Sequence, residues 1–400
     1  MERMDALMLP LNWQRVRLGD IAEIKRGVRI TKNELDVFGK YPVVSGGVGF
    51  LGYTNNFNRD ENTITIAQYG TAGYVNFQKN KFWANDVCFC IYPNKDIIKN
   101  IFLYYFLKVN QNYLYEISNR NATPYSISKD KILDFEILLP PLNEQNAIAN
   151  ILSGLDRYLC ALDALILKKE SVKKALSFEL LSQRKRLKGF NQAWQRVRLG
   201  DIGITISGLA GKTKQDFING NAKYITFLNI LNNVIIDTSI LENVKIYPNE
   251  KQNSFKKYDL FFNTSSETPK EVGMCAVLLD DIDQVFLNSF CFGFRIFDKA
   301  VDSLFLSYLI NSEIGRKAFE NLAQGSTRYN LSKSGFNNVC LFLPPLNEQS
   351  AIANILSALD NEITSLKNKK RQFENIKKAL NHDLMSAKIR VLKKSVLQQK

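Results

Sequence analysis

The strongest constraint on this fold is a stretch of sequence that occurs twice. Residues 139–156 read LPPLNEQNAIANILSGLD and residues 343–360 read LPPLNEQSAIANILSALD, so the copies differ at only two positions. A second pair of segments, WQRVRLGDI, is identical and begins at Trp13 and at Trp194. Self-similarity at so long a period indicates a tandem duplication, in which each copy is a globular segment followed by a helix.

Each copy predicts a long helix that carries a coiled-coil seam. Pro140 and Pro141 end the segment before it, Asn143 is the expected N-cap, and Glu144 then lies in the first turn, where the helix dipole favours an acid. Apolar residues recur at spacings of four and three, as in heptads, and continue after a phase shift typical of a stutter. The seam residues are Ile148, Leu152, Leu155, Leu159, Leu162, Ile166, Val172, Leu176 and Leu180 in the first copy, and Ile352, Leu356, Leu359, Ile363, Leu366, the polar Lys370, Phe373, Ile376, Leu380 and Leu384 in the second.

No proline or glycine should end these helices before about Lys188 and Leu397, apart from a tolerable Gly154. A helix of about 40 residues would be roughly 60 Å long. The matched seams favour pairing of the two helices with each other. The alternative is that each amphipathic helix packs independently on its own globular segment.

The predicted fold class is α+β, with a pseudo-two-fold internal repeat. We expect two globular segments of mixed strands and helices, residues 1–138 and 191–342, and two long-helix segments, residues 139–190 and 343–400. Strands are expected near Thr63–Gln68, Lys223–Leu228 and Cys291–Phe297, and helices near Ile101–Ile117 and Leu304–Ala323. Apart from their edges the two globular segments share little sequence, so any ligands they bind should differ.

Charge points to a polyanionic partner, because the formal net charge is +14. No apolar run of about 18 residues predicts a membrane span, and no signal peptide is recognisable at the N-terminus. The six cysteines form no CxxC pair, so they are expected to be reduced and not to bind a metal. A cytoplasmic protein is therefore expected.

The residues needed for catalysis are largely missing. His382 is the only histidine and lies on the second long helix, so histidine-dependent catalysis and His-metal sites are not expected. Gly47–Gly52 matches G-x-G-x-x-G, but a turn-rich segment follows instead of a helix, which predicts a glycine loop in a β-rich domain. The double prolines at 140–141 and 344–345 lack the flanking residues of an amino-methyltransferase motif.

With two divergent globular segments, each opening with W-x-x-V-x-L-G-D and closing with L-P-P-L-x-E-Q and a long helix, the chain resembles the DNA-specificity subunits of type I restriction-modification systems. The resemblance implies two target-recognition domains and an antiparallel coiled coil that acts as a ruler between them. Each domain would read one half of an asymmetric double-stranded DNA target. It also implies partners: two methyltransferase subunits that carry S-adenosylmethionine and methylate adenine N6, and motor-nuclease subunits that use ATP and Mg. The chain itself would hold no cofactor and would not be an enzyme.

Base reading in the major groove requires polar side chains held in turns. In the first segment the loops that fit best are 26–32, 45–53, 68–71 and 120–125, and in the second they are 212–214, 263–267 and 326–329. The loop Gly325–Arg328 resembles a recurrent loop of the family, and only Thr123 matches it in the first segment. The candidate DNA-binding residues are Arg26, Arg29, Lys32, Ser45, Tyr53, Gln68, Tyr69, Thr71, Arg120, Thr123, Tyr125, Lys212, Lys214, Thr264, Ser266, Glu267, Ser326, Thr327, Arg328 and Tyr329, of which Arg328 is the foremost.

Three alternatives remain open at this point. An autonomous methyltransferase would need a cofactor motif that the sequence lacks. A coiled-coil scaffold that binds only protein explains the helices but not two large divergent domains. RNA binding agrees with the charge, yet the aromatic pattern of an RNP-type domain is absent.

Overall fold

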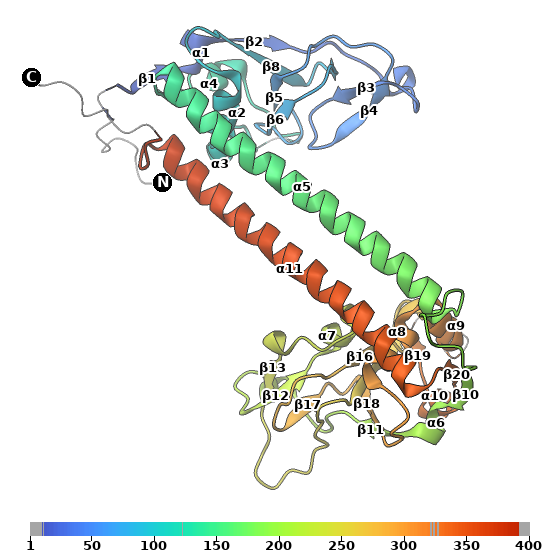
Figure 1. Ribbon diagram of the computed structural model, residues 1–400. Helices are drawn as coiled ribbons and strands as arrows, with labels where there is room; N and C mark the ends of the chain where they lie inside the picture. Colours follow the sequence, from blue (N-terminus) through green and yellow to red (C-terminus); the bar gives the residue numbers. More distant parts are fainter. Residues whose placement is uncertain are drawn as a thin grey trace, which may run out of the picture. The chain divides into compact units, whose positions relative to one another are not determined.

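The computed structural model describes residues 10, 12–121, 123–320, 322, 325 and 328–391, with the backbone alone for Glu320. Within these residues the fold is α+β and contains the internal repeat, as predicted. The chain divides into two compact units, Met1–Ala164 with Asn368–Lys400, and Leu165–Lys367. Each unit holds one globular domain and one part of each long helix (Figure 1). The predicted segment limits at residues 138, 190 and 342 stay a prediction, since the unit boundary falls inside both helices.

The first domain, residues 13–139, is built on two sheets. An antiparallel four-stranded sheet has the order β2-β8-β5-β6, and a three-stranded sheet has the order β4-β3-β7. Helix α2 packs against β5 and β6. The elements are β1 (Gln14–Arg17), α1 (Leu18–Ile21), β2 (Ala22–Arg26), η2 (Lys32–Glu34), β3 (Tyr41–Val44), β4 (Phe50–Thr54), β5 (Thr63–Ala67), β6 (Val75–Gln78), β7 (Trp83–Ala84), β8 (Cys88–Pro93), α2 (Asn100–Val109), α3 (Gln111–Glu116), α4 (Lys129–Leu133) and β9 (Glu136–Leu139).

The second domain, residues 194–343, repeats this plan with the sheet orders β11-β18-β14-β16 and β13-β12-β17. It adds a short pair, β15 with β19. Its elements are β10 (Gln195–Arg198), α6 (Leu199–Ile202), β11 (Gly203–Ser207), η3 (Lys214–Phe217), β12 (Ala222–Ile225), α7 (Phe227–Asn232), η4 (Thr238–Ile240), β13 (Glu242–Val244), β14 (Leu260–Asn263), β15 (Ser265–Ser266), η5 (Pro269–Glu271), β16 (Cys275–Val277), β17 (Val285–Leu287), β18 (Cys291–Ile296), α8 (Ser303–Asn311), α9 (Glu313–Glu320), β19 (Tyr329–Asn330), α10 (Lys333–Asn337) and β20 (Cys340–Leu343).

The two repeated motifs of each copy lie side by side. Strand β1, from the first WQRVR, pairs antiparallel with β9, which runs into the first double proline, and β10 pairs with β20 in the same way. Trp13 and Trp194, which precede these strands, are buried, and so are Leu18 and Leu199. The motifs therefore close each domain, and these four apolar residues belong to its core.

The predicted strands and helices are present, with breaks that the sequence did not reveal. Strands β5 and β18 match the expected strands, and Gly47–Gly52 forms the turn and start of the β3–β4 hairpin, as the glycine-loop interpretation expected. Each expected long domain helix is two helices, α2 with α3 and α8 with α9, interrupted at Asn110 and Ser312. The strand expected to reach Leu228 ends at Ile225, because Thr226 caps α7 by accepting a hydrogen bond from the Asn229 amide.

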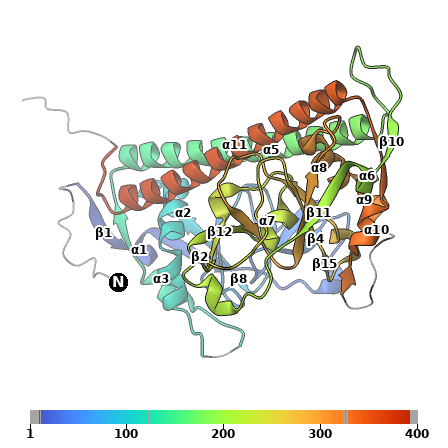
Figure 2. The same ribbon diagram turned by 90° about the horizontal axis from the view of Figure 1, so that it is seen from below.

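The long helices are α5 (Leu142–Leu181) and α11 (Leu346–Met385). Within each unit their parts lie side by side and antiparallel, which confirms the predicted pairing (Figures 1 and 2). In the first unit Lys370 binds Asp163, at 2.7 Å, and Lys377 binds Asp156. In the second unit Lys367 binds Glu170, at 2.6 Å, and Lys173 binds Asp360, at 2.5 Å.

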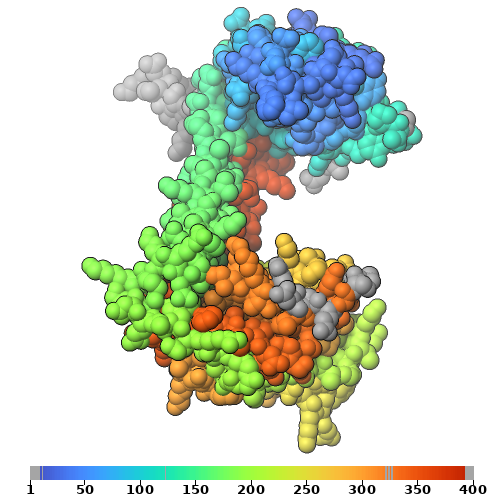
Figure 3. All heavy atoms as spheres, turned by 90° about the vertical axis from the view of Figure 1, so that its right-hand side faces the viewer, coloured from blue at the N-terminus to red at the C-terminus, as the bar shows by residue number. Residues whose placement is uncertain are grey.

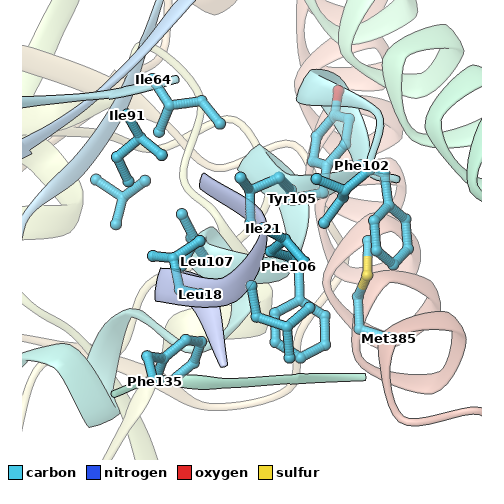
Figure 4. Close-up of a cluster of buried hydrophobic side chains, with 14 of the residues drawn as sticks. Leu18, Ile21, Ile64, Ile91, Phe102, Tyr105, Phe106, Leu107, Phe135 and Met385 are labelled. Atoms are coloured by element: carbon cyan, nitrogen blue, oxygen red, sulfur yellow. The ribbon is translucent and has the colours of Figure 1, made fainter. Parts of the chain in front are cut away.

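Each helix pair enters the core of its domain. In the first unit Ile148 and Leu152 of α5 and Leu384 and Met385 of α11 join the cluster that contains the domain's own apolar residues. Figure 4 shows Met385 beside Phe102 in this cluster. In the second unit the corresponding residues are Leu180 and Leu181 of α5 with Ile352 and Leu356 of α11. Burying each such side chain contributes about 1.5–3 kcal/mol, so the helices and domains stabilise one another.

The assignment of two residues to the seam is wrong. Val172 and Ile376 are 45% and 50% exposed. The next residue in each helix, Lys173 or Lys377, approaches the facing helix instead and binds an aspartate there. A hydrophobic repeat cannot reveal a lysine whose methylene stem packs on the seam while its ammonium pairs with an acid.

The predicted helix limits also need correction. Because α5 begins at Leu142, Asn143 lies inside its first turn and is not the N-cap. The helices end at Leu181 and Met385, earlier than expected, and the residues Gln183 and Ala387 that follow have positive φ angles of 62° and 59°. Leu181 and Met385 are held in the domain cores, so the chain turns there without a glycine or proline.

The glutamate of each L-P-P-L-x-E-Q motif is buried at the junction of helix and domain. Glu144 accepts hydrogen bonds from the Trp13 indole, at 3.1 Å, and from Arg390, at 2.6 Å. The Glu348 carboxylate accepts from Arg186 at 2.6 and 2.7 Å, and no other donor to it is found in the part of the chain that the structure describes. Both glutamates are 1% exposed. The adjacent glutamine is also equivalent in the two units, since Gln145 and Gln349 each accept from the backbone that precedes α2 or α8.

Candidate nucleic-acid interface

Two of the predicted loops of the first domain meet at one buried asparagine, Asn85. The Asn85 amide N–H binds the Val44 carbonyl at 2.9 Å, and its side-chain oxygen accepts from the Ile30 amide at 3.1 Å. Its side-chain nitrogen donates to the Ser45 hydroxyl at 3.3 Å. Asn85 therefore ties the loop after β2 to the turn of the β3–β4 hairpin. Sequence reasoning missed it, because nothing in the local sequence marks it as the shared partner of distant loops.

The loop after β5 joins the same edge of the first domain. The Thr71 amide donates to the Gly46 carbonyl at 2.8 Å, and the Gly70 amide donates to the Tyr125 carbonyl at 3.0 Å. A Cβ atom added to Gly46 would collide with the Tyr69 carbonyl, so glycine is required for this approach. The edge thus unites the loops 26–32, 45–49, 68–71 and 120–126. We call it the first loop edge.

The second domain builds an equivalent edge around Asn288. The Asn288 amide binds the Ile225 carbonyl at 3.0 Å, and its side-chain oxygen accepts from the Phe290 amide at 2.8 Å. The Phe290 carbonyl accepts from the Thr264 amide at 3.0 Å. Strand β15 then pairs with β19, which brings the loop after β14 to Arg328 and Tyr329. We call this the second loop edge.

Each edge presents an arginine over aromatic rings. The Arg120 guanidinium lies 5.2 Å from the ring centre of Tyr115 and 5.1 Å from that of Tyr125. The Arg328 guanidinium lies 5.6 Å from the ring centre of Phe290. Both arginines are exposed. Cation–π contacts help to hold a guanidinium in place, and an exposed guanidinium can donate to a base or a phosphate.

Most predicted contact residues lie at the surface of these edges. The exposed residues are Arg26, Arg29, Lys32, Tyr53, Arg120, Thr123, Tyr125, Lys214, Glu267 and Arg328, and the half-buried ones are Ser45, Gln68, Tyr69, Thr71, Thr264 and Tyr329. Ser326 and Thr327 lie outside the described residues. That these residues contact DNA stays a prediction.

Lys212 and Ser266 are held inside the second domain in this structure. The Lys212 side chain is 5% exposed, and its ammonium binds Glu250 and the Lys245 carbonyl, each at 2.5 Å. Ser266 is buried and donates to Glu271 at 2.7 Å. Their polar atoms therefore position loops and are not offered to a ligand.

Glu267 is an exposed acid at the second loop edge, but three acids beside the predicted loops 26–32 and 212–214 are engaged by donors of the protein. The Thr31 hydroxyl and amide lower the pKa of Glu34, and the Thr213 amide and hydroxyl lower the pKa of Asp216. Hydrogen bonds from Lys212, Gln252 and the Tyr247 amide lower the pKa of Glu250 to about 2. These carboxylates are ionised at neutral pH but internally paired, which leaves the exposed basic groups to dominate the interaction with a polyanion.

No helix in the described part of the chain is long and apolar enough to cross a membrane. The sequence matches the family described as type I restriction modification DNA specificity domain twice, over residues 10–170 and 191–375. These two matches coincide with the two copies of the internal repeat.

Individual relatives agree with this match. The specificity subunit of the type I restriction enzyme MjaVIII from Methanocaldococcus jannaschii is 28% identical, over 98% of this chain and 96% of its own length. The EcoDI specificity subunit of Escherichia coli is 30% identical over 48% of this chain and 38% of its own length. The crystal structure of a type I S subunit from M. genitalium shares the fold, with a TM-score of 0.67, 20% identity, and coverage of 95% of this chain and 98% of that one. The chain therefore belongs to the type I restriction-modification DNA specificity family and is a specificity subunit with two recognition domains.

Proposed function

We propose that this subunit binds a bipartite, asymmetric double-stranded DNA sequence, with each loop edge reading one half. Two methyltransferase subunits that carry S-adenosylmethionine would methylate adenine N6 in each half. Motor-nuclease subunits that use ATP and Mg would cleave unmodified DNA. This chain would then supply recognition without catalysis or a cofactor of its own, and because its ligand is the cell's DNA, the proposed location is the cytoplasm.

The observation that carries this proposal is a frame that the two domains share, with different side chains at the two loop edges. Gln68 and Thr264 occupy equivalent places in the two frames. The Gln68 carbonyl accepts a hydrogen bond from the Ile127 amide at 2.9 Å, and the Thr264 carbonyl accepts one from the Leu331 amide at 2.8 Å. Ile127 and Leu331 each directly precede a serine that caps a helix, α4 or α10. The residues that follow Gln68 and Thr264 differ, with Tyr69 and Gly70 in one domain and Ser265 and Ser266 in the other. Equal frames with unequal edges suit one protein that reads two unlike half-sites.

The basic surface suits the same ligand. Lysine and arginine contacts to phosphates supply affinity without sequence information, whereas side chains on the edges supply selection among bases. Methylation of adenine in a duplex also requires that the base leave the stack, so a subunit that grips the flanking duplex is needed beside the methyltransferase.

The first test is a genome-wide map of adenine methylation in the host, with the gene intact and with it deleted. The expected result is the loss of one bipartite motif that is methylated once in each half. In the same strain, the Phe342→Ala variant is a control, since Phe342 is an exposed residue of β20 outside both edges. That variant should leave the map intact.

A second test separates a silent system from a wrong assignment. The chain, co-purified with its methyltransferase partner, should bind a duplex that carries the mapped motif more tightly than duplexes with either half scrambled. If binding is the same for all three duplexes, the chain does not read sequence and the proposal fails. The isolated chain should show no binding of S-adenosylmethionine by calorimetry, and measurable binding would contradict the assignment of that cofactor to the partner.

A further inference from the structure

A turn in the first domain exposes two apolar residues to an unusual degree. Val37 and Phe38 are 90% and 93% exposed, the highest values among the large hydrophobic residues for which exposure is described. Single exposed apolar residues are common on protein surfaces, but an adjacent pair at the tip of a turn is not. Figure 3 shows the end of the domain that carries β3 and β4 facing the viewer, with the blue N-terminal part of the chain forming its surface.

Four hydrogen bonds centred on Asp36 define the conformation of this turn. The Gly39 amide closes the turn on the Asp36 carbonyl at 3.0 Å, and the Phe38 amide donates to the Asp36 carboxylate at 2.9 Å. Asp36 is fixed to β4, because its amide donates to the Tyr53 carbonyl at 2.8 Å and its carboxylate accepts from Asn55 at 2.6 Å. A preformed tip loses little conformational entropy when it enters a binding site.

The charge around the tip selects a polyanion as the occupant. Residues 25–40 contain five basic and two acidic side chains. Both acids are bonded internally, Glu34 to Thr31 and Asp36 to Phe38 and Asn55. Arg29 and Lys32 are exposed and belong to the loop that joins the first loop edge through Asn85. An apolar tip between basic residues matches a duplex, which offers phosphates outside and an apolar stack of bases inside.

We propose that Val37 and Phe38 form an apolar wedge that enters the DNA at the first half-site and separates two stacked base pairs. The proposal rests on the proposed function and adds a physical act to it, namely deformation of the duplex by the first domain. Proteins that kink DNA insert such apolar side chains between base steps, and the energy of unstacking makes binding depend on the sequence at the step.

The second domain provides a built-in comparison. The second domain has a turn after η3 that corresponds to the turn after η2 in the first domain. Each of these short helices begins with a capping box, formed by Thr31 and Glu34 in the first domain and by Thr213 and Asp216 in the second. The turn in the second domain ends at Gly220, where an added Cβ would collide with the backbone of Val244, as one on Gly39 would with Thr54. Between these marks the second domain has Ile218 and Asn219 where the first has Val37 and Phe38. Because asparagine cannot wedge as phenylalanine does, unstacking is expected only at the first half-site.

The test uses the complex of the full chain with its methyltransferase partner and duplexes of the mapped motif. 2-Aminopurine is placed at successive positions of each half, apart from the target adenines. The wild type should raise its fluorescence at one step of the first half. Phe38→Asn, which copies the second domain, should abolish this signal and weaken binding about tenfold. Phe38→Leu should retain both, and Asn219→Ala and Phe342→Ala should change neither.

Salt dependence distinguishes the wedge from a phosphate contact. Phe38→Asn should leave the slope of log affinity against log salt unchanged, whereas Arg29→Ala or Lys32→Ala should reduce it. The wedge is overturned if the unstacked step persists in Phe38→Asn or if the wild type shows no unstacked step. In either case, specific binding of the motif still supports the proposed function. If Phe38→Asn prevents assembly with the methyltransferase subunit, the turn is a protein contact and the wedge is again overturned. If the wild-type complex shows no preference for the motif, both proposals fail.

Discussion

The two recognition domains have one frame but different interiors and edges. Both use the same sheet orders and the same closing pair of strands, and both take the ends of α5 and α11 into their cores. The first domain adds a glycine-rich hairpin after β3, whereas the second places α7 after β12. The frame carries stability, so the segments between its strands can diverge without loss of the fold.

The interiors differ in the same way. In the second domain Phe336 of α10 contacts Phe262, Phe292, Phe294 and Phe319, with ring centres 4.8–6.1 Å apart. At the matching place in α4 the first domain has Ile132. Both residues are fully buried. The matching place therefore holds an aromatic side chain with four aromatic neighbours in one core and an aliphatic side chain in the other.

The largest expected effect tests this difference in packing. Phe336→Ala should destabilise the second domain by about 4 kcal/mol, and Ile132→Ala should destabilise the first by about 3 kcal/mol, because each leaves a cavity and the former also loses aromatic contacts. Hydrogen exchange followed by mass spectrometry at increasing urea reads each domain separately. A change in exchange that spreads equally over both domains would contradict the assignment of separate cores.

A smaller effect is expected at the two helix–domain junctions. Glu144→Ala removes the carboxylate that pairs with Arg390 and accepts from the Trp13 indole, so it should cost about 3 kcal/mol, whereas Glu348→Ala removes only the pair with Arg186 and should cost about 2 kcal/mol. Among the described residues the Trp194 indole N–H has no hydrogen-bond partner, so it has none to lose. A double-mutant cycle with Trp13→Phe measures the extra bond. Equal losses for the two glutamate variants would show that the indole contributes nothing.

The two loop edges should differ in how strongly DNA binding depends on the arginine of each edge. Arg328→Ala should weaken binding to the intact target by roughly 1–3 kcal/mol if the side chain reads a base. Arg120→Ala should weaken binding by a smaller amount, about 1 kcal/mol, because one N–H of Arg120 already donates to the Tyr115 carbonyl and its guanidinium packs on two rings of the protein. Fluorescence anisotropy with duplexes scrambled in one half or the other assigns each loss to a half-site. The idea of Arg328 as a reader is abandoned if its removal leaves the preference for the intact duplex unchanged.

The smallest effect is the pH dependence of one loop in the second domain. The loop 245–253 is held through Glu250, whose pKa is lowered to about 2 by Lys212, Gln252 and the Tyr247 amide. Because the pKa of Glu250 in the fold lies below the unfolded value of 4.5, its ionised carboxylate stabilises the fold above about pH 4.5. This contribution is lost as the pH falls from about 4.5 to about 2. Limited proteolysis at pH 2–5 by an acid protease should cut this loop increasingly as the pH falls.

The Glu250→Gln variant provides the control for this pH effect. It should be cut readily throughout the range, because its amide cannot replace the ion pair with Lys212. Constant protection of the wild-type loop down to pH 2 would show that Glu250 does not hold it.

Much of the architecture could be predicted because it depends on local or periodic signals. The exact repeats indicate the duplication, and spacings of four and three predict the paired helices. The resemblance carried by the two motifs identifies the family. The seam failed at Val172 and Ile376, where Lys173 and Lys377 take the inward place, since a charged residue becomes compatible with a seam only beside a partner on the other helix.

The candidate interface could be predicted loop by loop but not as an assembly. The sequence alone determined that this protein is a tandem duplication with two long helices, because those properties follow from its repeats and its hydrophobic periodicity, and the resemblance of its motifs indicated the family. Only the tertiary structure decided that Asn85 and Asn288 tie the loops together, that Lys212 and Ser266 face inward, and that Glu144 joins Trp13 to Arg390. These contacts link residues far apart in the chain, and no local pattern records which distant donor will meet which acceptor once the sheets are packed.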